Sequence, residues 1–250
     1  MNKVRFMKFS IAPLVLVLSL CSCKSQTLSS VIDAVEQQVN GSTTPTSAEI
    51  SRGLKEALSL SIEKGARSLS KKNAYFSDEV IKILLPEEAR GVVSTLNRLG
   101  FSSLTEKLIL KLNRAAEDAA LSSVPIFKDA ILSLNFSDSM KILTSKNSNA
   151  ATDFLKQKTS NQLKSLYESN IKNSLNKVGA DEVWTQVFST YNRLPGLNKV
   201  NPSLSDYATT KALDGLFYTV SKREAILRSN LSERTSPLLQ RIFGYADTLK

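Results

Sequence analysis

Histidine is absent from all 250 residues of the chain, and only two cysteines are present. Without histidine there is no histidine-based catalytic triad, no imidazole general base and no histidine ligand for a metal ion. The nine glycines are scattered, so no glycine-rich loop is present that could cradle phosphates. Any catalysis by this chain would therefore have to use carboxylates, tyrosine, or serine paired with lysine. We expect no metal and no cofactor, and we assign no catalytic residue.

Both cysteines lie in one short stretch, LVLSLCSCKSQ. Cys21 and Cys23 are too close in the chain for an unstrained disulfide, and they lack the further ligands of a metal site. Residues 1–22 combine a basic start with an apolar run too short to span a bilayer, which is typical of a signal peptide. Leu20 and Ser22 precede Cys23 by three positions and one position, so the stretch resembles a bacterial lipobox.

The resemblance to a lipobox implies that Cys23 becomes the first residue of the mature chain and carries a thioether-linked diacylglycerol. The new amino group is then open to a further acyl chain such as palmitate, and two or more chains anchor a protein stably. Cys21 leaves with the signal peptide, so no thiol remains. We therefore expect a lipoprotein of the cell envelope that faces the periplasm. Lys24 after the anchor favours the outer membrane over the inner membrane.

The formal net charge of +10 is spread along the chain. An excess of this kind suits contact with anionic lipid headgroups. It does not form the basic stripe that is typical of a nucleic-acid-binding protein, and an envelope protein has little access to DNA. We therefore expect a membrane partner and no nucleic acid.

The spacing of apolar residues predicts an all-α protein, a globular bundle of about 8–10 helices. Residues 23–46 are expected to form a lipidated tether with a short amphipathic segment, and residues 47–250 a single helical domain. Thr46 and Glu49 have the spacing of a capping box at the start of that domain. The short branched run 80–85 stops at a proline and is expected to be extended, or an isolated strand.

Two later helices have clear boundary signals. Ser203 and Asp206 have capping-box spacing before the longest late helix. Gly179 is expected to end the long helix that begins near Thr152, and Gly244 is expected to end the last helix.

Several segments, in this order, resemble one bacterial family: GLKEALSLSIEKGA, IKILLPEEARGVVSTLNRLG, LKLNRAAEDAA, VPIFKDAI, AATDFLKQKTSNQL and TTKALDGLFYTVSKREAILR. They are similar to the domain of unknown function 4197 over residues 50–244, and NRAAEDAA and KALDGLF are the most specific pieces. Members are typically exported, often as lipoproteins. The resemblance therefore implies a fold and a location, and no activity. The chain has Leu84-Leu85-Pro86 where the family more often has Pro-Leu-Pro.

Polar residues beside apolar helix stripes are the first candidates for a site. Asn113 and Glu117 lie one helical turn apart and flank the apolar stripe of their helix, while Arg114 stands at the same spacing from Asp118. These residues can face a cleft. Alternatively, they form a polar border, or a buried hydrogen bond that sets the register of the helix.

Two further candidate groups lie late in the chain. Lys211 and Asp214 share a helix face and are either part of a site or an ion pair. Gly215 follows them and is expected to permit close approach of another helix. Arg234 and Thr235 stand at the expected start of the last helix, where they could bind an anion or simply cap the helix.

Two pairs of neighbouring acids could also serve chemistry. Glu87 with Glu88 and Asp181 with Glu182 each begin an expected helix, where acids are favoured by the helix dipole. That local reason accounts for them, whereas a glycosidase needs two carboxylates at a defined separation in space.

The favoured hypothesis is a lipid-anchored binding module, rather than an enzyme, that takes an apolar or anionic amphiphilic ligand between its helices. One alternative is a scaffold that docks another envelope protein through an exposed apolar patch. The other is a histidine-free enzyme that uses carboxylate or serine/lysine chemistry. Convergence of the candidate residues on one cavity would distinguish a ligand site from a purely structural cluster.

Overall fold

The computed structural model describes residues 44–91, 94, 98, 102–177, 179, 184–185, 189, 192–193, 195, 199 and 203–249. Residue contacts divide the chain into two units, Met1–Thr43 and Thr44–Lys250, and the described residues all belong to the second unit. The expected signal peptide at 1–22, the lipidated Cys23 and the amphipathic segment of the tether lie outside the described residues. So does most of the region around Asp181 and Glu182.

Seven α-helices and two single-turn 3₁₀ helices form the regular structure of the described residues, which contain no strand. The prediction of an all-α fold is confirmed. The α-helices are α2 (Ser47–Leu69), α4 (Ser102–Ala120), α5 (Ser123–Leu132), α6 (Phe136–Thr144), α7 (Ala150–Asn176), α9 (Leu204–Ser229) and α10 (Pro237–Thr248). The 3₁₀ helices are η1 (Glu87–Ala89) and η2 (Leu231–Glu233).

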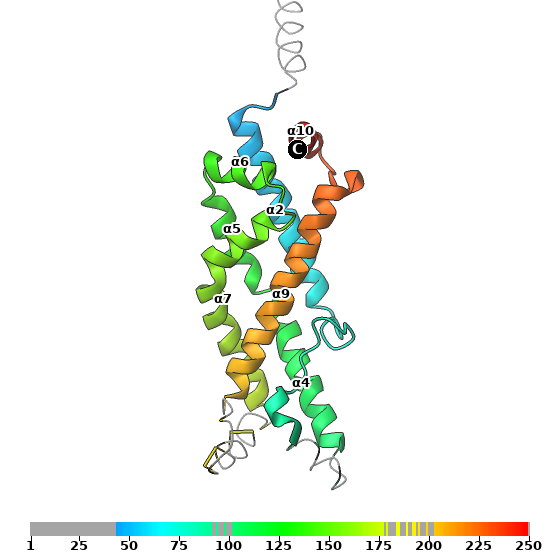
Figure 1. Ribbon diagram of the computed structural model, residues 1–250, viewed down its shortest axis with the longest axis vertical. Helices are drawn as coiled ribbons and strands as arrows, with labels where there is room; N and C mark the ends of the chain where they lie inside the picture. The colour runs from blue at the N-terminus through cyan, green and yellow to red at the C-terminus, as the bar shows by residue number, and fades with distance from the viewer. Residues whose placement is uncertain are drawn as a thin grey trace, which may run out of the picture. The chain divides into compact units, whose positions relative to one another are not determined.

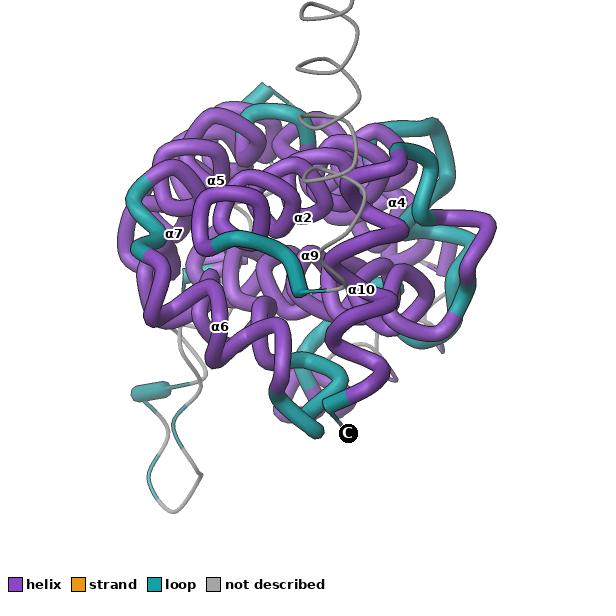
Figure 2. The backbone as a smooth tube through the Cα atoms, turned by 90° about the horizontal axis from the view of Figure 1, so that it is seen from above, coloured by secondary structure: helices purple, strands orange, loops and turns teal. Residues whose placement is uncertain are grey.

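Helix α2 lies at the centre of the bundle. It contacts α4, α5, α6, α9 and α10, which surround it in the end-on view of Figure 2. The two longest helices, α7 and α9, pack against each other and run along the long axis of Figure 1. Helix α4 packs against α7 and α9 at the end of the bundle opposite α6 and α10.

The helices begin where the sequence places capping residues. The Thr46 hydroxyl accepts the Glu49 N–H at 3.2 Å, and the Glu49 carboxylate accepts the Thr46 N–H at 2.8 Å, so both halves of the capping box are present. The Ser203 hydroxyl likewise accepts the Asp206 N–H at 3.2 Å. Each of these bonds satisfies a backbone N–H that a helix start would otherwise leave without a partner.

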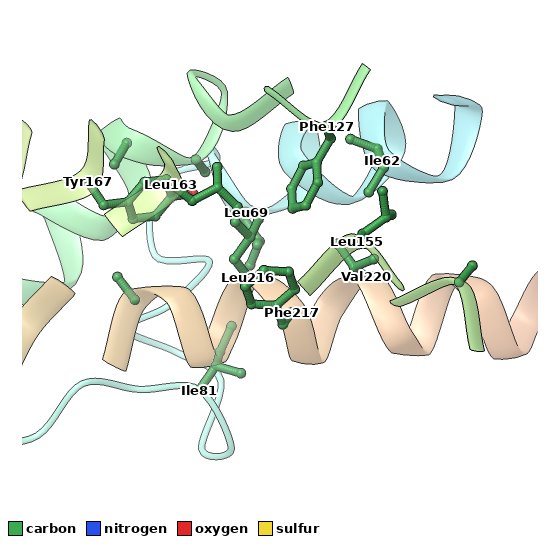
Figure 3. Packing of buried hydrophobic residues seen from close by; sticks show 14 of the residues in the cluster. Ile62, Leu69, Ile81, Phe127, Leu155, Leu163, Tyr167, Leu216, Phe217 and Val220 are labelled. Carbon is green, nitrogen blue, oxygen red and sulfur yellow. The ribbon is translucent and has the colours of Figure 1, made fainter. Parts of the chain in front are cut away.

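The core is a continuous apolar cluster to which the helices of the bundle contribute (Figure 3). Ile62 of α2, Phe127 of α5, Leu155 of α7 and Phe217 of α9 are among its members. The rings of Phe127 and Phe217 meet edge to face with their centroids 5.8 Å apart. Such an aromatic pair adds about 0.5–1.5 kcal/mol beyond the area that it buries.

The prediction that Gly244 ends the last helix is wrong. Helix α10 continues through Gly244 to Thr248. The apolar stripe explains the continuation, because Phe243 and Ala246 on either side of the glycine are both buried. Burial of that face outweighs the weak helix propensity of one glycine, which costs about 1 kcal/mol relative to alanine. Gly179, by contrast, follows the end of α7 with φ +63°, in the left-handed region that suits glycine.

Residues 70–86 join α2 to η1, and we call them the connector. The connector consists of turns up to Ile81 and has no regular structure from Lys82 to Pro86, so the run 80–85 is not a strand. Despite this irregularity Tyr75 and Ile83 are almost completely buried. Buried backbone polar groups need hydrogen-bond partners, and helix α4 supplies several of them.

Candidate functional site

Asn113 of α4 is fully buried and holds the end of the connector. Its Oδ1 accepts the Ile83 N–H at 2.9 Å, and its Nδ2 donates to the Ile83 carbonyl at 2.8 Å. Nδ2 also donates to the Ile109 carbonyl of its own helix at 2.7 Å. One amide side chain thus pairs both backbone groups of a buried residue, as a neighbouring strand would. The structure places Asn113 in a buried hydrogen bond rather than at a cleft.

Glu117 of α4 holds the start of the connector. Its side chain is 3% exposed, and its two carboxylate oxygens accept the N–H groups of Asn73 and Tyr75 at 3.1 Å each and that of Phe76 at 3.4 Å. Arg114 pairs with the same carboxylate and also donates to Asn73 Oδ1 at 2.6 Å. Arg114 therefore bonds Glu117 and the connector, rather than being held by an ion pair with Asp118.

Tyr75 attaches the connector to helix α9. Its buried hydroxyl donates to the Ala212 carbonyl at 2.8 Å. Burial raises the pKa of the Tyr75 hydroxyl well above its ordinary value, so the hydroxyl stays a donor. A Cβ at Gly215 would lie 2.6 Å from Tyr75 Cε1 and 3.2 Å from Ile81 Cβ. Gly215 does permit a close approach, but the segment that approaches is the connector and not a helix.

Lys211 and Asp214 lie apart from the α4 cluster. Lys211 Nζ is 3.9 Å from Asp214 Oδ2, and both side chains are about half exposed. Ala212 and Gly215, their neighbours in the sequence, face the connector, so the pair occupies the solvent side of α9. The structure therefore gives these two residues a weak surface ion pair.

Arg234 lies apart from both groups. It caps η2 rather than beginning α10, and its side chain is 3% exposed. Its Nη2 donates to Asp247 Oδ2 at 2.8 Å and to the Arg228 carbonyl at 3.0 Å. These bonds tie the chain between α9 and α10 to the last turn of α10. Nη2 thereby has both of its partners inside the domain, while Nε is buried without a hydrogen-bond partner among the described residues.

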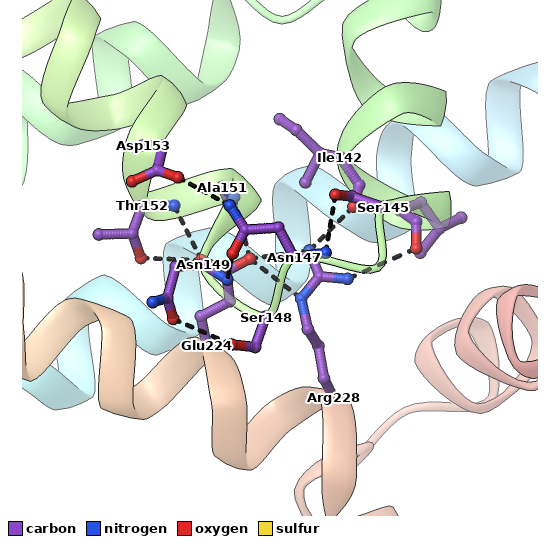
Figure 4. Close-up of polar contacts among 11 residues, drawn as sticks. Ile142, Ser145, Asn147, Ser148, Asn149, Ala151, Thr152, Asp153, Glu224 and Arg228 are labelled. Atoms are coloured by element: carbon purple, nitrogen blue, oxygen red, sulfur yellow. Dashed lines mark hydrogen bonds and ion pairs between the residues drawn. The ribbon is translucent and has the colours of Figure 1, made fainter. Parts of the chain in front are cut away.

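Glu224 and Arg228 of α9 form a buried ion pair that the sequence analysis missed (Figure 4). Glu224 accepts the N–H groups of Ala151 and Thr152 at 2.9 and 2.8 Å, which caps the start of α7. Arg228 donates to the Ile142 carbonyl at 2.8 Å, at the end of α6. The pair thus closes two helix termini at once, where their dipoles favour an anion and a cation respectively.

A sequence signal for this pair exists. Glu224 follows Val220 by four positions and precedes Leu227 by three, so it occupies a position within the apolar stripe of α9. A carboxylate inside such a stripe must be paired when it is buried. Arg228, one turn further on, is the partner that this spacing predicts.

An open groove of about 630 Å³ lies where the connector meets α4. Leu84, Leu85 and Pro86 of the connector form part of its lining with Ile109 of α4. Among the described residues, its lining also contains two arginines, Arg90 and Arg98, and no carboxylate. Arg90 also forms a surface ion pair with Glu87, which precedes it by three residues. We call this feature the apolar groove.

A second cavity, of about 570 Å³, lies between the end of α2, the connector and α9. We call it the basic cleft. Its charged lining residues are Lys71, Lys72, Asp78, Lys222 and Arg223. Four cations against one carboxylate leave this cavity with a strong positive excess.

A family model described as protein of unknown function (DUF4197) matches residues 44–244. The chain belongs to this family. No curated protein and no solved structure matches the chain. The match covers the connector, both cavities and the helices as far as Gly244 in α10.

Two further properties of the described residues bear on the site. None of the helices described here has the length and hydropathy to cross a bilayer. Within the same residues, no three acidic, cysteine or histidine side chains gather in a group suited to holding a metal ion.

Proposed function

We propose that this domain binds an anionic amphiphile in the apolar groove while a lipid on Cys23 holds the chain at the envelope membrane. The observation that carries the proposal is the composition of the groove, whose described lining residues combine an apolar wall with two arginines and include no acid. Ligand sites commonly have volumes of about 300–1,000 Å³ and are mainly apolar with a few polar groups that fix orientation.

The two parts of the groove suit the two parts of such a ligand. Leu84, Leu85 and Ile109 offer apolar surface to an alkyl chain, and each methylene that leaves water contributes about 0.8 kcal/mol. Arg90, which also pairs with Glu87, and Arg98 place guanidinium groups in the lining, and such groups can bind carboxylate or phosphate oxygens in addition to their partners in the domain.

The connector wall of the groove is held in place before any ligand arrives. Asn113 pairs both backbone groups of Ile83, and the Tyr207 hydroxyl donates to the Leu84 carbonyl at 3.0 Å. A wall that needs no ordering on binding spares the ligand that entropic cost. Leu84 nevertheless keeps 54% of its surface exposed, so a ligand can still bury it.

The proposal is tested by photo-crosslinking in membranes that contain the full chain. One probe carries a diazirine on a twelve-carbon chain with a phosphate headgroup, and its twin carries a phosphocholine headgroup on the same chain. We expect the anionic probe to label peptides that contain Leu84 and Ile109, and the zwitterionic twin to label them several times less.

Leu84→Glu and Leu132→Glu form a matched pair for this experiment. Both leucines are exposed, but only Leu84 lines the groove. Labelling should be lost in the first variant and kept in the second. Equal labelling of both variants, or no preference between the headgroups, would contradict the proposed ligand class.

The anchor is tested separately by feeding cells labelled palmitate. Cys23→Ser should abolish incorporation into the chain, whereas Cys21→Ser should leave it intact, because only Cys23 has the lipobox spacing. Incorporation that survives Cys23→Ser would exclude this residue as the sole site of acylation.

A further inference from the structure

The basic cleft differs from the apolar groove in both chemistry and position. It lies between the end of α2, the connector and α9, and its lining residues do not overlap with those of the groove. Hydroxyl side chains of Ser68, Ser77 and Thr219 stand among its cations. Ammonium, guanidinium and hydroxyl donors around one cavity are the donor set that phosphate oxygens accept.

The positive charge of the cleft is only partly neutralised from within. Arg223 Nη2 is 3.5 Å from Glu233 Oε2, whereas Lys64 Nζ approaches the same oxygen to 2.9 Å. Glu233 is therefore shared between two cations, and Arg223 has the longer contact. Arg223 Nε is buried and has no hydrogen-bond partner within the described part of the chain. Among the described residues, the guanidinium of this cleft-lining side chain therefore has one ion-pair contact, and that contact is long.

The other charged groups are placed by local contacts. Lys222 Nζ lies 4.6 Å from the centre of the Tyr218 ring, which holds the ammonium at the wall of the cleft. Asp78 Oδ1 accepts the Val80 N–H at 2.9 Å, so the one acid among the described lining residues also closes a turn of the connector. Lys71 and Lys72 are exposed and begin the connector.

The cleft is preorganised by the residues that the sequence analysis singled out on α4. Glu117 fixes the backbone at Asn73, Tyr75 and Phe76, immediately after Lys71 and Lys72. Tyr75 ties the same stretch to α9, which carries Lys222 and Arg223. The connector, which carries Lys71 and Lys72, is therefore joined to α9 across the cleft. The buried hydrogen bonds of Glu117 and Tyr75 offset the electrostatic repulsion between the cations that this arrangement brings together.

We propose that the basic cleft binds a phosphate group carried on a small ester, either a soluble phosphomonoester or the headgroup of a phosphomonoester lipid. The proposal is independent of the ligand of the apolar groove. A volume of about 570 Å³ is larger than phosphate alone requires and leaves room for the attached alcohol.

Lysine acylation of the full chain in micelles of a nonionic detergent provides the test, with mass spectrometry as the readout. The extent of modification at Lys71, Lys72 and Lys222 is compared with that at Lys141 and Lys146. These two are exposed lysines outside the cleft and act as an internal control. One arm adds glycerol 3-phosphate at constant ionic strength, and the other dopes the micelles with phosphatidic acid.

We expect saturable protection of the cleft lysines and none of the control lysines. Protection by glycerol 3-phosphate identifies a soluble ester as sufficient, and protection by phosphatidic acid alone identifies a lipid headgroup. Absence of protection in both arms, or equal protection of the control lysines, would overturn the proposal.

Charge-matched variants extend the test. Lys71→Gln/Lys72→Gln and Lys141→Gln/Lys146→Gln remove the same charge from exposed positions, so neither is expected to unfold the domain. In the first variant, the ligand concentration that gives half-maximal protection of Lys222 should rise about tenfold, as expected for the loss of charge-assisted contacts. The Lys141→Gln/Lys146→Gln variant should leave the protection of Lys222 unchanged. Weaker protection in this variant and not in the first would contradict the proposed phosphate site. Leu84→Glu should also leave the protection of Lys222 unchanged, which separates this result from that of the apolar groove.

Discussion

The carboxylate of Glu117 lies 3.1 Å from the backbone N–H of Tyr75, although 42 residues separate the two in the sequence. Through this bond a buried side chain of a regular helix supplies the partner that an irregular segment lacks. The consequence is that Glu117, Arg114 and Asn113 of α4 shape cavity walls without lining a cavity themselves. Their roles can be separated from ligand contact by measuring stability and binding in the same variants.

Removing Glu117 should be costly. Glu117→Ala leaves three backbone N–H groups without their acceptor and leaves Arg114 without its carboxylate. We expect the free energy of unfolding to fall by about 3–5 kcal/mol, as for breaking a buried ion pair by removing one partner. Urea unfolding measures this. Glu168→Ala, at an exposed position of α7, is the control and should change stability by no more than about 0.5 kcal/mol. A similar effect of both substitutions would contradict the role of Glu117.

Asn113→Leu should destabilise the domain by about 2–4 kcal/mol. Leucine has nearly the same shape but leaves the N–H and carbonyl of buried Ile83 without partners, each at a cost of about 1–3 kcal/mol. Because Ile83 precedes Leu84 in the groove wall, labelling of the groove by the anionic probe should also fall. If stability drops while labelling stays intact, Asn113 does not position the groove.

Substitutions of the buried pair Glu224 and Arg228 should have strongly non-additive effects on the free energy of unfolding. Arg228→Met leaves the Glu224 carboxylate buried without its cation, and we expect a loss of about 3–5 kcal/mol. Adding Glu224→Gln removes the uncompensated charge, so the double variant should be more stable than the sum of the two single effects predicts. A double-mutant cycle by chemical denaturation measures the coupling. Simple additivity would show that the two side chains act independently.

Gly215→Ala should lower the free energy of unfolding, whereas Gly244→Ala should raise it. A methyl group at Gly215 meets Tyr75 Cε1 at 2.6 Å, and overpacking of this kind costs about 1–3 kcal/mol. A methyl group at Gly244 meets nothing within 4 Å inside α10, so alanine there should stabilise by about 0.5–1 kcal/mol. Thermal unfolding distinguishes them, and a shift in the same direction for both would contradict the close contact at Gly215.

The capping box should make a pH-dependent contribution to the free energy of unfolding. Hydrogen bonds from the Thr46 backbone and hydroxyl lower the pKa of Glu49 below its ordinary value of 4.5. A lowered pKa means that the stabilisation is complete above the unfolded-state pKa and is lost as the pH falls through the folded-state pKa. Glu49→Gln should therefore cost about 0.5–1 kcal/mol at neutral pH and less in acid. Urea titrations at both pH values test this, and a pH-independent difference would refute it.

Much of the helical fold follows from local pattern. The capping box at Thr46 and Glu49, the serine cap at Ser203 and the glycine after α7 are all where the sequence predicts them, because each is satisfied within a few residues of chain. Gly244 was misread because burial of the α10 stripe, a tertiary effect, outweighs the local signal of one glycine.

The candidate site was predictable only in part. Asn113 and Glu117 were identified as polar residues beside a buried stripe, but their partners lie 30 to 44 residues away in the connector. The connector has no periodicity, so nothing in its sequence reveals which side chains will satisfy its backbone. Lys71 and Lys72 read as ordinary solvated charges until the fold brings Lys222 and Arg223 opposite them.

The connector forms a wall of both cavities, with Lys71 to Ile81 in the basic cleft and Leu84 to Pro86 in the apolar groove. A ligand that displaces this shared wall at one cavity changes the free energy of occupying the other. Such coupling is reciprocal by thermodynamic necessity, so each ligand would change the affinity for the other by the same factor. A segment without regular secondary structure would thereby couple the two proposed ligands, cooperatively or in competition.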